Sequence, residues 1–317
     1  MEYLILILSL AGIVLGADFL VKGAVVVARK CRVSSFVIGA VIVGIGTSLP
    51  ELVVSTVGAI GGNSEVAIGN VVGSNIFNVF AILGLTALFF PIAVSRENMK
   101  FEIPFCIAVS VLLMLLVYNF FVVGEPRLGR WDGVALLLVF TAFMWISLRR
   151  GKNSAATVGE SVEEENKSLW FAAFSILGGL AALIVSSNFF VDEAVAIARK
   201  LGVSDAFISI TLLACGTSLP ELAASVTAAV KKDTDMALGN IIGSNIFNAT
   251  MILGTASLIT PLTTGKIGLV DYGAMILAAV LPMIFGIRGK ITRIEGLLML
   301  LCYAAYTWYI VTYVMAV

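Results

Sequence analysis

The sequence predicts an all-α integral membrane protein of ten transmembrane helices, arranged as two inverted five-helix repeats with broken helices at the midplane of the bilayer. Hydrophobic residues make up 60% of the 317 residues and charged residues only 13%, a composition outside the range of ordinary soluble domains. Apolar runs of about 20 residues, the length that crosses a bilayer, recur along the chain. The hexapeptide Gly-Thr-Ser-Leu-Pro-Glu occurs twice, at 46–51 and 216–221, which indicates a duplication.

Ten apolar segments are expected to span the membrane. They lie near 4–29, 34–60, 65–90, 102–123, 132–149, 169–198, 204–230, 235–260, 267–287 and 293–316. The polar stretch 150–168 divides them into an N-terminal repeat at 1–149 and a C-terminal repeat at 169–317. Four glutamates, Glu160, Glu163, Glu164 and Glu165, indicate that this stretch is a solvated linker.

The two halves match at a constant offset of 170 positions, from Arg29 and Arg199 to Pro91 and Pro261. Each half is predicted to have five spans. Because five is an odd number, the second half must enter the membrane in the opposite orientation. In inverted repeats of this kind, the substrate site lies at the interface of the repeats, near the midplane.

The distribution of positive charges predicts the orientation of the chain. Fourteen Lys and Arg residues fall in predicted loops on the side of the linker, and five fall in loops on the other side. Cytoplasmic loops carry the excess of positive charge. We therefore expect a multi-pass protein of the plasma or inner membrane, with the linker in the cytoplasm and both termini outside.

The repeated hexapeptide predicts a cation site. Pro50 has no N–H to bond the carbonyl of Gly46, so the helix should kink or open there and leave backbone oxygens unpaired. Thr47, Ser48 and Glu51 add side-chain oxygens on about the same face, a set of neutral oxygens around one carboxylate that suits a hard cation. A kink used only for helix packing is the alternative, but glutamates at hydrocarbon depth favour an ion pathway. The second copy supplies Thr217, Ser218 and Glu221.

A second repeated motif, Gly-Ser-Asn-Ile-Phe-Asn, occupies 73–78 and 243–248. It places a hydroxyl and an amide at positions i and i+4, on one helix face. These pairs are Ser74 with Asn78 and Ser244 with Asn248. The Gly-x-x-x-Gly patterns at 69–73 and 239–243 predict close packing of the two helices of one repeat. Interhelical hydrogen bonds are favoured over cation binding for Asn70, Asn75, Asn240 and Asn245.

Ionisable and amide side chains near the first span of each half are interpreted as structural. A structural ion pair or a water-filled vestibule is favoured over a binding role for Asp18, Lys22, Asn188, Asp192 and Glu193.

Several other classes of site are not expected. The chain has no histidine and four scattered cysteines, so a histidine-ligated transition metal and a thiolate metal site are disfavoured. Its net charge is zero, so nucleic acid is not expected as a partner, and it has no Gly-rich nucleotide loop. We expect a protein that is not an enzyme, that lies in the lipid bilayer, and that has neither a cofactor nor an obligate protein partner.

The paired motifs resemble the two alpha-repeats of the sodium/calcium exchanger family, within the cation/calcium antiporter superfamily. The resemblance extends over the whole chain in span number and repeat layout. It implies that the second, third, seventh and eighth helices enclose the ion sites, and that two sliding helices alternate the access. The 18 polar residues 151–168 of the linker are too few for a regulatory domain, so the chain is similar to prokaryotic members without one.

The resemblance also implies roles for individual residues. Glu51 and Glu221 would be the central carboxylates, joined around Ca2+ by the backbone carbonyls of Thr47 and Thr217. An outer sodium site would use Ser48, Ser218 and the carbonyl of Ala214. An inner sodium site would use Ser74, Ser244 and the carbonyl of Gly44, and Asn78 and Asn248 would lie between the two.

The expected function is secondary antiport of Ca2+ against Na+. Some family members have an aspartate where this chain has Asn248, and the loss of that carboxylate argues against co-transport of K+. A Ca2+/H+ antiporter is the nearest alternative, although it would want more titratable groups in the pathway. A cation channel is the second alternative, but duplicated inverted halves favour alternating access over a continuous pore. A purely structural scaffold would leave the two buried glutamates unexplained.

Overall fold

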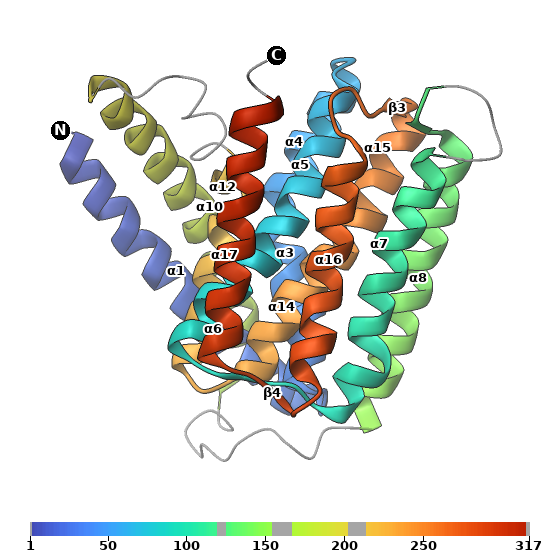
Figure 1. Ribbon diagram of the computed structural model, residues 1–317. Helices are drawn as coiled ribbons and strands as arrows, with labels where there is room; N and C mark the ends of the chain where they lie inside the picture. The colour runs from blue at the N-terminus through green and yellow to red at the C-terminus, as the bar shows by residue number, and fades with distance from the viewer. Residues whose placement is uncertain (1, 119–124, 154–166, 202–213, 315–317) are drawn as a thin grey trace.

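The computed structural model describes residues 2–118, 125–153, 167–201 and 214–314. In these ranges the chain folds into helices, with four strands of two residues each. Long helices run side by side between the two ends of the molecule (Figure 1). The predicted all-helical fold class is therefore confirmed.

Several helices continue into one another through π-helical segments, which are labelled η. The first half contains α1 (Glu2–Cys31), α2 (Ser35–Ile38), η1 (Gly39–Val43), α3 (Gly44–Thr47), α4 (Leu49–Ile60), α5 (Ser64–Phe77), η2 (Asn78–Leu83), α6 (Gly84–Phe89), β1 (Ile92–Ala93), η3 (Asn98–Glu102), α7 (Ile103–Tyr118), β2 (Arg127–Leu128) and α8 (Arg130–Asn153). The second half contains α10 (Leu169–Lys200), α12 (Ala214–Gly216), α13 (Leu219–Val230), α14 (Thr234–Phe247), η6 (Asn248–Ile252), α15 (Leu253–Ile259), β3 (Leu262–Thr263), α16 (Leu269–Gly286), β4 (Lys290–Ile291), α17 (Arg293–Tyr309) and η7 (Ile310–Val314).

Among the described residues, eight helices are long and apolar enough to cross a membrane, and a bent pair of helices at 35–60 adds a ninth candidate. Their ends lie close to the predicted ones. The spans predicted at 65–90 and 235–260 are found at Ser64–Phe89 and Thr234–Ile259. The predicted span 204–230 is described only from Ala214 onward, because 204–213 lie outside the described residues. The count of ten spans stays a prediction.

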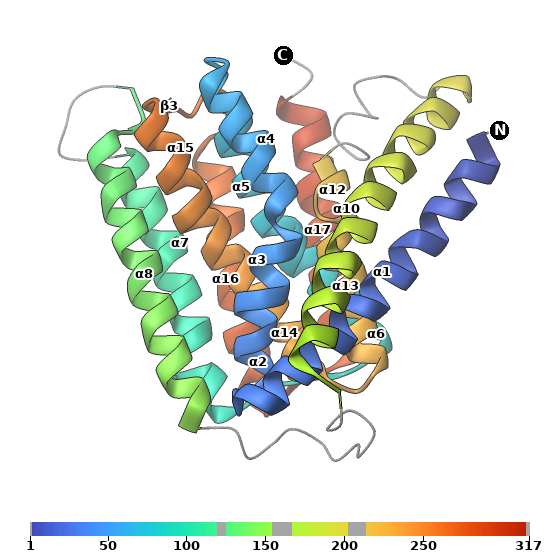
Figure 2. The same cartoon turned by 180° about the vertical axis from the view of Figure 1, so that it is seen from behind.

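The start of α1 and the end of η7 lie on one side of the molecule, and the ends of α8 and α10 that flank the linker lie on the opposite side (Figure 1 and Figure 2). An odd number of spans in each half requires this arrangement. Two short antiparallel ladders connect the halves, one at each end of the molecule. Ile92 of β1 pairs with Ile291 of β4, and Arg127 of β2 pairs with Thr263 of β3.

Two helical columns form the centre of the molecule. The most apolar windows of α5–η2–α6 and α14–η6–α15 are 78% and 83% buried, against 33% and 28% for those of α1 and α10. The peripheral helices α1 and α10 pack extensively against each other. Toward the side where α1 begins, both lean away from α4 and α5 (Figure 2).

The predicted helix break is present, in a different form. The helix α3 ends at Thr47 and α4 begins at Leu49, with a bend of 47° between them. Ser48 forms the joint, with φ −83° and ψ 10°. Pro50 therefore lies in the first turn of a new helix, where its missing N–H breaks no intrahelical bond. Ser218 repeats this joint before α13, with φ −93° and ψ 8°.

The prediction about Gly239 and Gly243 is wrong in one respect. These glycines bring together helices of different repeats, not the two helices of one repeat. A Cβ atom on Gly239 would lie 2.2 Å from the carbonyl oxygen of Phe36, and one on Gly243 would lie 2.4 Å from the Cα of Ala40. The small residues on α14 thus let it pack directly on α2 and η1 of the first half, because a hydrogen atom takes the place of a side chain there.

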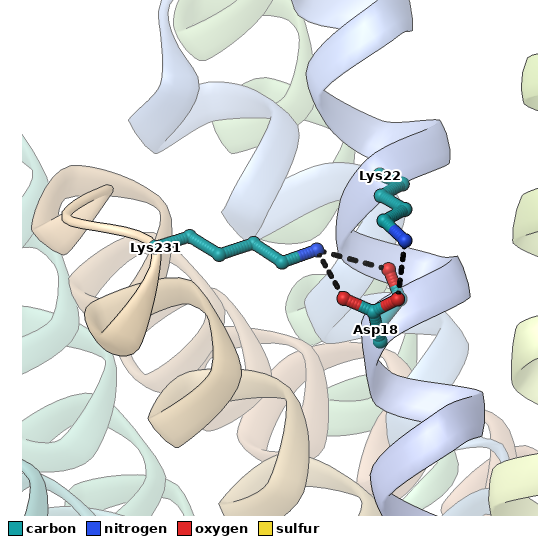
Figure 3. Close-up of polar contacts among 3 residues, drawn as sticks. All are labelled: Asp18, Lys22 and Lys231. Atoms are coloured by element: carbon teal, nitrogen blue, oxygen red, sulfur yellow. Dashed lines mark hydrogen bonds and ion pairs between the residues drawn. The ribbon is translucent and has the colours of Figure 1, made fainter.

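An ion-pair cluster attaches the peripheral helix α1 to the end of α13 (Figure 3). The Nζ of Lys22 lies 2.6 Å from Oδ2 of Asp18, one helical turn away. The Nζ of Lys231, directly after α13, lies 2.7 Å from Oδ1 of Asp18 and donates a hydrogen bond of 3.2 Å to its backbone carbonyl. The structural ion pair expected for Asp18 and Lys22 is therefore present, and Lys231 extends it to the second half.

Breaking this cluster should have a small, measurable effect on stability. The side chains of Lys231 and Asp18 are 29% and 31% exposed, and ion pairs in such surroundings contribute about 0.2–1 kcal/mol. In a double-mutant cycle of thermal unfolding in detergent, Lys231→Met and Asp18→Asn should show a coupling energy of this size. Lys232→Met makes the same change one residue later and is the matched control. Equal coupling of both lysines to Asp18 would contradict the specific ion pair.

Candidate cation site

The two helix breaks place one glutamate each at the centre of the molecule. Glu51 lies in the first turn of α4 and Glu221 in the first turn of α13, and both side chains are fully buried. Each carboxylate therefore lies near the start of a 12-residue helix, where the helix dipole favours negative charge. The break that the proline requires thus also helps to hold a carboxylate in an apolar interior.

Reciprocal hydrogen bonds join the two breaks. The hydroxyl of Ser48 donates to Oε1 of Glu221 over 2.8 Å, and the hydroxyl of Ser218 donates to Oε1 of Glu51 over 3.0 Å. Each glutamate is thus contacted by a serine of the other repeat. The two carboxylates face a common region that neither half of the chain forms alone.

Two asparagines on the central columns support the broken helices. Asn70 donates from Nδ2 to the backbone carbonyl of Glu51, at 3.3 Å, and to the hydroxyl of Ser55, at 3.0 Å. Asn240 makes the equivalent bonds to the carbonyl of Glu221, at 3.1 Å, and to Ser225, at 2.8 Å. The interhelical role favoured for Asn70 and Asn240 is present. Sequence reasoning missed Ser55 and Ser225, although they also match at the offset of 170.

Six buried oxygen atoms around this region have no hydrogen-bond partner among the described residues. They belong to six residues, all of which are part of the predicted cation site. The atoms are Glu51 Oε2, Glu221 Oε2, Ser74 Oγ, Asn78 Oδ1, Asn248 Oδ1 and Thr217 Oγ1. An unpaired buried polar atom costs about 1–3 kcal/mol. Carboxylate, hydroxyl and amide oxygens are the ligands that hard cations prefer, so the set fits a site for Ca2+ or Na+.

The remaining predicted ligands make different contacts in the two repeats. Ser244 donates to the carbonyl of Gly44 over 3.2 Å, so these two predicted ligands lie together. The hydroxyl of Thr47 lies 3.4 Å from the same carbonyl and 3.3 Å from Oδ1 of Asn240. Within the described residues, Ser74 makes no such bond to Gly44, and the bonds of Ser48 and Ser218 go to glutamates and not to the carbonyl of Ala214.

The family model described as sodium/calcium exchanger protein matches residues 1–149 and 171–312. The chain belongs to the sodium/calcium exchanger family. It is a membrane antiporter and not an enzyme. This exchanger is 35% identical to sodium/calcium exchanger MaX1 of Methanosarcina acetivorans, over 96% of this chain and 97% of MaX1. It is 34% identical to the inner membrane protein YrbG of Escherichia coli K12, over 87% of this chain and 86% of YrbG.

A solved structure has the same fold as this exchanger. It is the sodium-calcium exchanger NCX_Mj soaked with 10 mM Na+ and zero Ca2+, which superimposes with a TM-score of 0.83 at 33% sequence identity. The match covers 98% of each chain. The similarity therefore includes both halves of the exchanger and the helices that carry the two glutamates.

Neutralising either glutamate should abolish high-affinity binding of Ca2+. In Glu51→Gln and Glu221→Gln, the amide oxygen still accepts the serine hydrogen bond, but one unit charge is lost. At about 4 Å and an effective dielectric constant of about 20, a pair of unit charges interacts by about 4 kcal/mol. We expect calcium affinity, measured by calorimetry on purified protein, to fall at least about 100-fold.

The matched control for this test is Glu102→Gln. Glu102 is a buried glutamate at the end of η3, 5% exposed, and it makes no described contact with the site. All three variants should elute as folded, monodisperse protein. Unchanged calcium affinity in either Glu51→Gln or Glu221→Gln would contradict the assignment of these carboxylates as cation ligands.

Proposed function

We propose that this protein is a secondary active antiporter that exchanges Ca2+ for Na+ across the cell membrane, by alternating access at one shared carboxylate site. The observation that carries the proposal is the pair of buried glutamates from opposite repeats, each with one unpaired carboxylate oxygen. The family and the fold shared with NCX_Mj support it.

Charge balance at the site explains the coupling of the two ions. Two buried carboxylates carry two negative charges, which either one divalent ion or several monovalent ions can neutralise. The other unpaired oxygens, on Ser74, Asn78, Thr217 and Asn248, are neutral and add ligands without adding charge. Ca2+ and Na+ then compete for the same glutamates, and this competition is the exchange step. We place the carbonyls of Thr47 and Thr217 beside Ca2+, and the two predicted sets of serines and carbonyls at sodium sites on either side. Asn78 and Asn248 lie between these sodium sites.

The peripheral helices α1 and α10 are the moving part in this proposal. The most apolar windows of these two helices are only 33% and 28% buried, and the helices pack chiefly on each other. The central columns, in contrast, carry Asn70 and Asn240, which bond the backbone carbonyls of the two glutamates. A sliding of α1 and α10 over this centre would change the side from which ions enter without rebuilding the site.

Calcium uptake into sealed vesicles tests the proposal directly. Purified protein is reconstituted, and Na+, K+ and H+ gradients are imposed one at a time. Outward Na+ gradients should drive saturable Ca2+ uptake, with no requirement for K+, because position 248 is a neutral asparagine. Uptake driven only by a pH gradient would establish Ca2+/H+ antiport instead, and single-channel currents would establish a channel.

Acid should inhibit the exchange by competition. A proton on Glu51 or Glu221 occupies an oxygen that Ca2+ needs and removes the charge that attracts it. Lowering the pH should therefore raise the apparent KM for Ca2+, and raising the Ca2+ concentration should move the midpoint of inhibition to lower pH, because the bound ion favours the deprotonated pair. Vesicle uptake at several fixed Ca2+ concentrations measures this shift. A midpoint that does not depend on Ca2+ would mean that the titrating group lies outside the site.

A further inference from the structure

We propose that Asn75 and Asn245 are positioning residues that fix the amide orientation of Asn248 and Asn78, so that both of these present an oxygen atom, and not an N–H group, to the cation. This inference rests on the proposed function, since it concerns the same site. The sequence favours only interhelical hydrogen bonding for Asn75 and Asn245. Here these two residues also orient two cation ligands.

The starting point is a pair of hydrogen bonds across the central columns. Nδ2 of Asn75 donates to the backbone carbonyl of Asn245 over 3.1 Å, and Nδ2 of Asn245 donates to the backbone carbonyl of Asn75 over 3.1 Å. A backbone carbonyl oxygen can only accept a hydrogen bond. The nitrogen end of each amide is therefore fixed toward the opposite helix, and its oxygen end must point the other way.

The oxygen atoms of Asn75 and Asn245 determine the orientation of two further amides, those of Asn248 and Asn78. Oδ1 of Asn75 accepts from Nδ2 of Asn248 over 3.2 Å, and Oδ1 of Asn245 accepts from Nδ2 of Asn78 over 3.0 Å. Because an amide has its donor and its acceptor on opposite branches, the oxygen atoms of Asn78 and Asn248 must turn away from this network. Both side chains are fully buried, and both oxygens belong to the set without a hydrogen-bond partner.

A reversed amide shows what the network prevents. If Asn248 were reversed, its oxygen would face the oxygen of Asn75 and its two N–H groups would face the site. Those N–H groups would repel a cation and could donate to the free carboxylate oxygens of the glutamates. The site would then satisfy itself and lose its attraction for Ca2+. Asn75 and Asn245 exclude this state, because two backbone carbonyls that can only accept fix the orientation of their own amides.

The pairing is crossed, and this makes the inference testable. Asn75, in the first repeat, acts on Asn248 in the second, and Asn245 acts on Asn78. A residue that only holds α5 against α14 would affect both ligands equally. A positioning residue should affect only its own partner.

The test is a set of double-mutant cycles on the full-length protein in vesicles, with Asn75→Leu and Asn245→Leu as the network variants. Leucine keeps about the same size without any donor or acceptor. We expect Asn75→Leu to raise the apparent KM for Ca2+ about tenfold, the size of effect usual for a residue that orients a metal ligand, with little change in the maximal rate. Calcium binding to purified protein should weaken by the same factor.

The crossed backgrounds provide the control. In an Asn248→Ala protein, Asn75→Leu should cause no further increase in KM, whereas in an Asn78→Ala protein its about tenfold effect should remain. Asn245→Leu should show the reverse pattern. Equal effects of Asn75→Leu in both backgrounds would overturn the positioning role and leave only helix packing. Asn75→Ala and Asn75→Ser, which avoid overpacking, carry the same test if the leucine variant does not fold.

The wild-type protein separates this inference from the proposed function. If wild-type protein shows no uptake driven by Na+, the proposed exchange is wrong, and calcium binding by the same variants still decides the positioning role. If the wild type exchanges and the network variants show no crossed coupling, only the positioning role is wrong.

Discussion

The structure depends on two carboxylates held deep inside an apolar bundle. A buried charge is costly unless it is compensated, and the side chains that bond Glu51 and Glu221 are neutral serine hydroxyls. The hydroxyls and the helix starts lower the free-energy cost of burying each carboxylate, but they do not neutralise its charge. In the proposed exchanger, the remaining compensation comes from a bound cation or, when none is bound, from a proton. In the proposed function, the unpaired oxygen atoms of these two residues are what allows the centre of the molecule to bind a cation.

The other features of the centre follow from this constraint. A helix has to break for a glutamate to sit at a helix start in mid-membrane, and Ser48 and Ser218 provide the joints. The break needs support, which Asn70 and Asn240 give by bonding the glutamate carbonyls. Close packing of α14 on the first half needs glycine at 239 and 243. The result is a buried centre with polar groups, surrounded by less buried helices.

The sequence was sufficient for those features that local chemistry determines. Hydropathy placed the central columns within a residue of their observed ends, and Pro50 indicated the break, which lies at Ser48, between α3 and α4. Partners across the molecule were harder to predict. The glycines at 239 and 243 show that one helix face is small, but small residues do not say which helix packs there. The offset of 170 relates positions by symmetry and not by contact, so it could not show that Asn75 pairs with Asn248.

The crossed bonds between the repeats also have a consequence for how the protein is made. The serine that bonds Glu51 lies 167 residues later in the chain. At a synthesis rate of about 5–20 residues per second, the ribosome needs roughly 10 to 30 seconds to deliver it. During that time the first half lies in the membrane with a carboxylate that its own sequence does not satisfy. The site therefore cannot form from the first half alone, and a nascent chain that stops before residue 218 leaves Glu51 without this partner.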